Sequence, residues 1–96
     1  MSDTCLTPAV DTGREMTLTL LTRVYCHLCD DMRSALAPIA RSANATIVEI
    51  DVDTDPALEA RFGERVPVLL AGGIDDGREL CHYTLDRARV STALAR

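Results

Sequence analysis

The sequence contains no lysine and no tryptophan, and its 96 residues include only two tyrosines and one phenylalanine. All ten basic residues are therefore arginine, and fifteen acidic residues outnumber them, which gives a formal net charge of −5 at pH 7. A nucleic-acid-binding surface requires clustered positive charge and often aromatic stacking platforms. The composition therefore argues against nucleic-acid binding, while protein partners stay open.

Long apolar runs are also missing. No stretch approaches the roughly 18 residues that a membrane-spanning helix needs. The first fifteen residues lack the apolar core of a signal peptide, because Asp3, Asp11 and Glu15 interrupt them. We therefore expect a cytoplasmic protein that does not bind membranes. Four cysteines are too few and too unevenly spaced for a secreted disulfide scaffold.

The length allows one small domain, and a hydrophobic content of 47% is normal for a globular protein. Residues 1–15 mix Ser, Thr, Asp, Pro and Gly without a period, so we interpret them as a flexible N-terminal tail. Residues 16–96 form the predicted domain, and Met16 is an alternative start of the protein. We expect this domain to act as a monomer.

Four segments have the pattern of β-strands, and they are residues 17–25, 45–52, 66–71 and 78–83. In the second segment Val48 and Ile50 share one face and Ile47 lies on the other, which predicts a parallel strand covered by helices on both faces. The Asp76-Gly77 pair predicts the turn of an antiparallel hairpin between the last two strands.

Three segments have the pattern of helices. From His27 onward apolar residues recur at helical spacing, and Pro38 is expected to kink or end this helix. Asp55 followed by Pro56 is typical of an N-cap and a first helical position, and Asp86 is placed to cap a last helix. The predicted order is β-α-β-α-β-β-α, with the first two strands parallel.

Two cysteines three positions apart, Cys26 and Cys29, lie between the first predicted strand and the first predicted helix. Thiols at this spacing are close enough to form a disulfide, and the unpaired N–H groups and positive dipole end of a helix stabilise a thiolate. A Cys-x-x-Cys near a βαβ pattern is typical of a thioredoxin-like redox motif in a reducing compartment. The sequence therefore predicts a redox site.

The element order, the Cys-His-Leu-Cys motif at residues 26–29 and the Val66-Pro67 pair together resemble the glutaredoxin and thioredoxin superfamily. The nearest likeness is to small bacterial glutaredoxin-like proteins, over residues 16–96. It implies a thioredoxin fold, an α/β domain whose four-stranded mixed sheet is flanked by helices. It also implies that Pro67 is the family's cis-proline and that the backbone of Val66 pairs with the substrate as a short added strand.

The resemblance also bears on the electron donor. Members that use glutathione usually carry Thr before Val-Pro, an aromatic residue before the second cysteine and a Gly-containing turn before the last helix. This sequence instead has Arg65 before Val66-Pro67 and Leu28 before the second cysteine. Of the turn before the last helix it keeps only the acidic residue, Asp86. Glutathione or a flavin-dependent thioredoxin reductase is the expected reductant, and no cofactor is implied. Disulfide-containing proteins or glutathione mixed disulfides are the expected substrates.

Cys26 is the expected nucleophile, with a moderately lowered pKa, because it lies nearest the helix start, and Cys29 is the expected resolving thiol. Arg23 and a protonated His27 add positive charge near the thiols, although His27 is alternatively a solvated spacer. Leu28, between the cysteines, is expected to tune the site together with His27.

Near Val66-Pro67, Arg61 and Arg65 lie where a substrate carboxylate docks in one interpretation and are plain surface charge in the other. Cys81 is expected to be a small buried hydrophobic residue. Cys5 is expected to be incidental.

Three alternatives to an oxidoreductase stay open. A zinc site needs about four ligands, and the neighbours Cys81 and His82 point to opposite faces of a strand, which disfavours it. A glutathione-bridged iron–sulfur cluster on Cys26 is a second alternative. The third is a non-catalytic thioredoxin-fold module that binds a partner or senses redox state. An acidic turn at residues 75–77 suggests a cation loop only weakly, because a hairpin turn explains it.

Overall fold

The computed structural model describes residues 16–95, so the predicted N-terminal tail lies outside the described residues. The elements, in chain order, are β2 (Thr17–Thr22), α2 (His27–Ser42), β3 (Thr46–Asp51), the 3₁₀ turn η2 (Val52–Thr54), α3 (Pro56–Phe62), β4 (Val68–Ala71), β5 (Arg78–His82) and α4 (Arg87–Leu94). The predicted order of strands and helices is confirmed, with η2 as the one addition.

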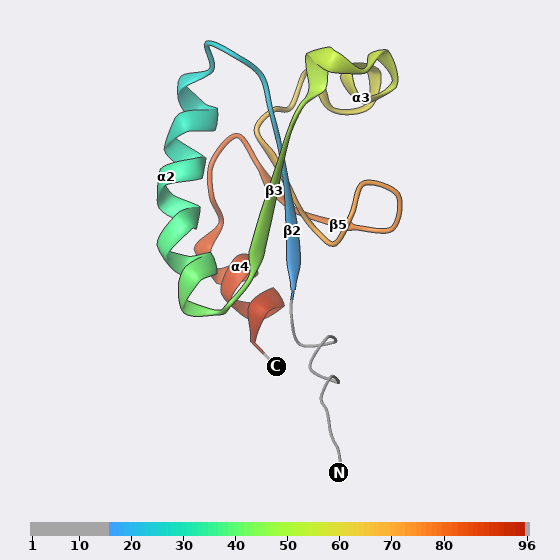
Figure 1. Ribbon diagram of the computed structural model, residues 1–96. Coiled ribbons are helices and arrows are strands. Elements are labelled where there is room, and N and C mark those ends of the chain that lie inside the picture. Colours follow the sequence, from blue (N-terminus) through green and yellow to red (C-terminus); the bar gives the residue numbers. More distant parts are fainter. Residues whose placement is uncertain (1–15, 96) are drawn as a thin grey trace.

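The strands form one mixed sheet in the order β3-β2-β4-β5. β3 is parallel to β2, β4 is antiparallel to β2, and β5 pairs antiparallel with β4 as the predicted hairpin. Helices α2 and α4 lie on one side of the sheet and α3 on the other (Figure 1). Leu21 is paired with Val68, so β4 begins at the end of the sheet where β2 finishes.

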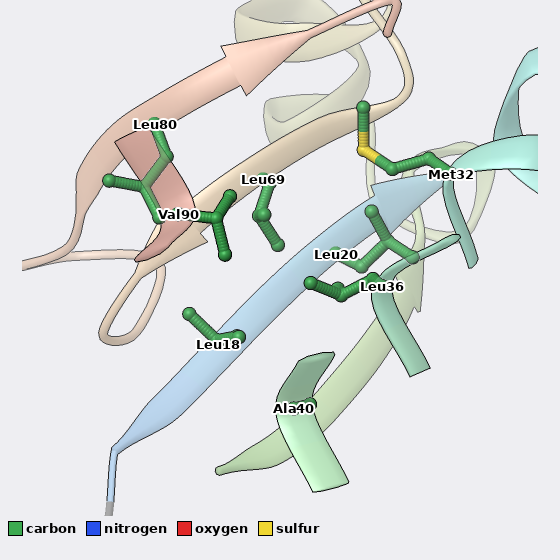
Figure 2. Packing of buried hydrophobic residues seen from close by; sticks show 8 residues of the cluster. All are labelled: Leu18, Leu20, Met32, Leu36, Ala40, Leu69, Leu80 and Val90. Atoms are coloured by element: carbon green, nitrogen blue, oxygen red, sulfur yellow. The ribbon is translucent and has the colours of Figure 1, made fainter. Parts of the chain in front are cut away.

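Alternate residues of β2 face two separate apolar clusters. Leu20 packs on the side of α2, with Met32 and Leu36 from that helix (Figure 2). The full set of buried residues in this cluster is Leu18, Leu20, Met32, Leu36, Ala40, Leu69, Leu80 and Val90. Leu21 points to the opposite side, where Leu58 and Phe62 of α3 cover it. Both helices next to the redox motif are thus fixed by core packing.

The first strand is shorter than predicted. It ends at Thr22 instead of residue 25, because the chain turns away from the sheet and Tyr25 adopts a positive φ of 57°. Similarly, the third strand begins at Val68, two residues after the predicted start. Both shortened ends lie next to Cys26 or Val66-Pro67. The strand boundaries were therefore mispredicted where the backbone leaves the sheet to form the candidate site.

Pro38 was expected to kink or end the first helix, and the structure shows that it does not end it. α2 runs without interruption from His27 to Ser42 with Pro38 inside it. A proline removes one backbone donor, which leaves the carbonyl of Ser34 without its helical partner. Both residues are exposed, so water can solvate that carbonyl, while buried Ala40 keeps the following turn packed.

No helix within residues 16–95 is long and apolar enough to cross a membrane.

The prediction for the second strand was correct in its direction and wrong in its burial. β3 is parallel to β2, but it lies at the edge of the sheet, and the helices cover each of its faces only in part. Ile47 packs against the α2-side cluster and Ile50 against the α3-side cluster. Val48 is 42% exposed because α3 is only seven residues long and does not reach it.

Candidate redox site

Cys26 and Cys29 form a disulfide at the start of α2, with their Cα atoms 5.2 Å apart. Cys26 is the N-cap residue, and its Sγ accepts a hydrogen bond from the backbone N–H of Cys29 at 3.1 Å. An N-cap side chain normally satisfies one of the unpaired N–H groups of the first turn. The sulfur thus takes the place usually held by a hydroxyl or carboxylate oxygen, where negative charge is favoured.

The two sulfurs differ in exposure, and the helix explains why. Cys29 shares the inward stripe of α2 with Met32 and Leu36, and it is fully buried. Cys26 precedes the first helical turn and is partly exposed. An external disulfide can therefore approach Cys26, whereas Cys29 is accessible mainly from Cys26 itself.

The segment before Cys26 presents apolar side chains to solvent. Val24 is 61% exposed and Tyr25 is fully exposed. Tyr25 has a left-handed backbone conformation, which is a genuine outlier for a bulky residue. Such conformations concentrate at functional sites, where the surrounding structure maintains them. On the helix side of the motif, Leu28 is 43% exposed and His27 is also exposed.

Val66 and Pro67 are joined by a cis peptide bond, as the resemblance implied. They directly precede β4, so the sheet register places them at the same end of the sheet as Cys26. The carbonyl of Pro67 accepts a hydrogen bond from the N–H of Tyr83 at 2.9 Å. The backbone N–H and carbonyl of Val66 have no hydrogen-bond partner among residues 16–95. These groups are therefore available to an added strand.

The Arg23 guanidinium is bound by two carboxylates. It donates to Asp53 at 2.9 and 3.1 Å and to Glu59 at 3.4 Å, and to the carbonyl of Gly63 at 3.2 Å. The hydrogen bond from Arg23 lowers the pKa of the Asp53 carboxyl below its usual range. Arg23 therefore ties η2 to α3, and its charge is largely compensated. Its expected contribution to thiolate stabilisation or substrate binding stays a prediction.

Arg65 also has a carboxylate partner, since it is paired with Glu79 of β5. Burial alone raises the pKa of Glu79, but the hydrogen bonds from Arg65 and His82 outweigh it, so the net shift is downward. Arg61 lies with its guanidinium carbon 4.7 Å from the ring centroid of Phe62 and has no ion-pair partner among the described residues. Arg61 is thus the more available of the two predicted carboxylate-binding residues.

Cys81 is half-buried on β5, and burial raises the pKa of its thiol. Cys81 was expected to be a small buried hydrophobic residue; it packs against the α2-side cluster but is only partly buried. Its neighbour His82 pairs with Glu79 at 2.9 Å. Within residues 16–95 no three potential metal ligands from His, Cys, Asp and Glu lie together. The zinc alternative has no ligand set in this part of the chain.

Two tyrosines near the motif were not predicted as site residues. Tyr25 was assigned to the first strand, and Tyr83 to the end of the last strand. In the structure Tyr83 has a φ of 66°, and its hydroxyl donates to the carbonyl of Glu64 at 3.0 Å. The sequence did contain a signal for them. The chain has only two tyrosines, and each is next to a residue with a reactive or titratable side chain, Tyr25 beside Cys26 and Tyr83 beside His82.

Residues 17–95 match a family described as "Glutaredoxin-like domain (DUF836)". Among curated proteins, an uncharacterized protein of Mycobacterium tuberculosis is 35% identical over 82 residues, which cover 80% of each chain. An uncharacterized protein of Mycobacterium bovis has the same identity and coverage. These relatives support the family but carry no assigned activity.

Solved structures support the same fold. The protein Ne2328 from Nitrosomonas europaea superposes with a TM-score of 0.74 at 27% identity, covering 99% of this chain and all of that one. A protein from X. campestris is 41% identical with a TM-score of 0.60, covering 82% of this chain and 99% of that one. A thioredoxin from Halobacterium salinarum, 22% identical, has a TM-score of 0.64 and covers 88% of this chain and 76% of its own. The expected thioredoxin fold is confirmed.

Proposed function

This chain belongs to the glutaredoxin-like domain family (DUF836), and on that premise we propose that it is a dithiol thiol–disulfide oxidoreductase. The observation that carries the proposal is the asymmetric disulfide at the start of α2. Cys26 is partly exposed and accepts a backbone hydrogen bond, while Cys29 is buried one turn along. A structural disulfide needs neither the exposure of one sulfur nor its place at a helix N-terminus.

The reaction starts from the reduced dithiol. The Cys26 thiolate attacks one sulfur of a substrate disulfide, forms a mixed disulfide and releases the other substrate sulfur as a thiolate, which takes a proton. The thiolate of Cys29 then attacks the Sγ of Cys26, which re-forms the Cys26–Cys29 disulfide and releases the second substrate thiol. Two electrons and two protons pass from the protein to the substrate.

The oxidised protein then needs an external two-electron reductant. Glutathione and a flavin-dependent thioredoxin reductase are the two candidate classes, and both fit a reducing cytoplasm. A coupled assay that follows NADPH oxidation through glutathione reductase or through thioredoxin reductase distinguishes them. Substrates are disulfide-containing proteins or glutathione mixed disulfides, received beside the unpaired backbone groups of Val66.

The test of the proposal is a trapping experiment. Reduced Cys29→Ser protein is mixed with a neutral small disulfide, and peptide mapping by mass spectrometry locates the adduct. We expect a stable mixed disulfide on Cys26, and rapid resolution without an adduct in the wild type. Cys81→Ser serves as the matched control and behaves like the wild type. If Cys29→Ser forms no adduct on Cys26, the oxidoreductase proposal fails and a non-catalytic binding module is favoured.

A further inference from the structure

The Cys26 end of the molecule carries an apolar patch. Five large hydrophobic side chains are strongly exposed in the described part of the chain. Three of them flank Cys26 and Cys29 in the sequence, and Tyr83 follows His82, which pairs with Val68 at the same end of the sheet. We call these four the docking patch, and they are Val24, Tyr25, Leu28 and Tyr83. The fifth, Val48, lies apart on the edge strand. Exposed apolar side chains gathered beside a reactive group indicate an interaction surface.

The same end of the molecule holds the negative charge of the domain. Residues 22–33 and 49–66 form most of it, at the top of Figure 1, and they contain eight acidic residues against four arginines. The acids are Asp30, Asp31, Glu49, Asp51, Asp53, Asp55, Glu59 and Glu64. The rest of the described chain is balanced, with four acids and four arginines. The docking patch is therefore bordered by net negative charge.

The arginines at this end do not reverse that charge. Arg23 and Arg33 are each held between two carboxylates, so neither is available to an incoming anion. Four of the eight acids, Asp31, Asp51, Asp55 and Glu64, have no ion-pair partner within residues 16–95, against the single unpaired Arg61. The carbonyl of Glu64 accepts the Tyr83 hydroxyl, which places this residue at the rim of the docking patch.

We infer that the docking patch selects polypeptide disulfides with positively charged residues beside the cysteine and disfavours anionic disulfides, including that of glutathione. The inference rests on the proposed function and names its substrate class. The apolar patch buries residues on both sides of the substrate sulfur, and the acidic border attracts their basic neighbours. Complementary charge of this kind raises association rates and suppresses partners of like charge.

The experiment compares three synthetic peptide disulfides of equal length, whose cysteine is flanked by lysine, serine or glutamate. The second-order rate constant for their reduction by the reduced wild-type protein is measured at low salt. Each rate is divided by that for dithiothreitol, which corrects for the intrinsic reactivity of each disulfide. We expect the lysine peptide to react about tenfold faster than the glutamate peptide, and 0.5 M NaCl to reduce this ratio towards one.

Matched variants locate the effect. Glu64→Gln and Asp31→Asn are expected to lower the lysine-to-glutamate rate ratio about two- to threefold each, mainly by slowing the lysine peptide. Asp75→Asn removes one exposed acid from the turn at the other end of β4 and leaves the ratio unchanged. Equal normalised rates for all three peptides overturn the inference alone. If the protein reduces none of them, including the serine peptide, the proposed function itself fails.

Discussion

Among single residues, Tyr25 combines two features that a stability argument does not explain. Its side chain is fully exposed, so it contributes no core packing. Its backbone has a φ of 57°, which is unfavourable for a residue with a Cβ by about 1–2 kcal/mol. A residue that is strained and contributes nothing to packing is consistent with a role in contacting partners, as part of the docking patch.

The strain at Tyr25 predicts the outcome of a pair of substitutions. Tyr25→Gly removes the Cβ and relieves the strain. Glycine also makes the unfolded chain more flexible, which offsets about 0.5–1 kcal/mol of that gain. We expect Tyr25→Gly to raise the free energy of unfolding of the oxidised protein by about 0.5–1 kcal/mol relative to Tyr25→Ala, measured by urea denaturation. Both variants lose the ring and are expected to react more slowly with peptide disulfides. A glycine variant less stable than the alanine variant contradicts this account of the backbone.

At the scale of elements, α2 positions the redox motif in spite of an internal proline. Its buried stripe of Cys29, Met32, Leu36 and Ala40 keeps the helix packed on both sides of Pro38. The stripe therefore determines both the burial of Cys29 and the continuity of the helix. Tertiary packing here overrides a local preference of about 3 kcal/mol.

The destabilising effect of a proline inside a helix can be tested by the same substitution in two helices. Pro38→Ala restores a backbone donor for the Ser34 carbonyl inside α2, and we expect it to raise the free energy of unfolding by about 1–2 kcal/mol, less than the full propensity difference because proline also restricts the unfolded chain. Pro56→Ala is the control, since Pro56 is the first residue of α3, where proline is favourable. It is expected to be neutral or slightly destabilising. Equal effects at both positions, measured by urea denaturation, contradict the explanation.

Features encoded locally were predictable from the sequence, whereas several features set by tertiary contacts were not. Asp55 and Asp86 cap their helices as predicted, because a cap depends on residues within one turn. The edge position of β3 was missed, since alternation in a sequence does not reveal how far a helix extends over a strand. The pairing of Arg23 with Asp53 was missed too, because these residues are 30 positions apart and meet only through the parallel sheet.

At the scale of the whole molecule, arginine–carboxylate pairs connect elements that are distant in the sequence. Arg33 of α2 bonds to Glu49 of β3, and that hydrogen bond lowers the pKa of the Glu49 carboxyl. The pairs of Arg23 with Asp53 and of Arg65 with Glu79 lower the pKa of those carboxyls in the same way, in the latter case against the effect of burial. These pairs join the loop before Cys26 to η2, α2 to β3, and the residue before Val66 to β5, so we expect acid to loosen this end first.

The lowered pKa values determine the direction of the acid effect. A carboxyl whose pKa is lower in the folded state binds fewer protons than in the unfolded chain, so its stabilisation is complete above about pH 4.3 and is lost as the pH falls through the folded-state value. Urea denaturation at pH 7 and pH 3 measures the loss. We expect it to be smaller in Glu49→Gln than in the wild type by about 0.5–1 kcal/mol, since both partners are more than a third exposed and solvent screens the pair. Asp75→Asn, whose side chain pairs with no arginine in residues 16–95, is expected to match the wild type. An unchanged loss in Glu49→Gln would show that Arg33 and Glu49 do not stabilise the folded state.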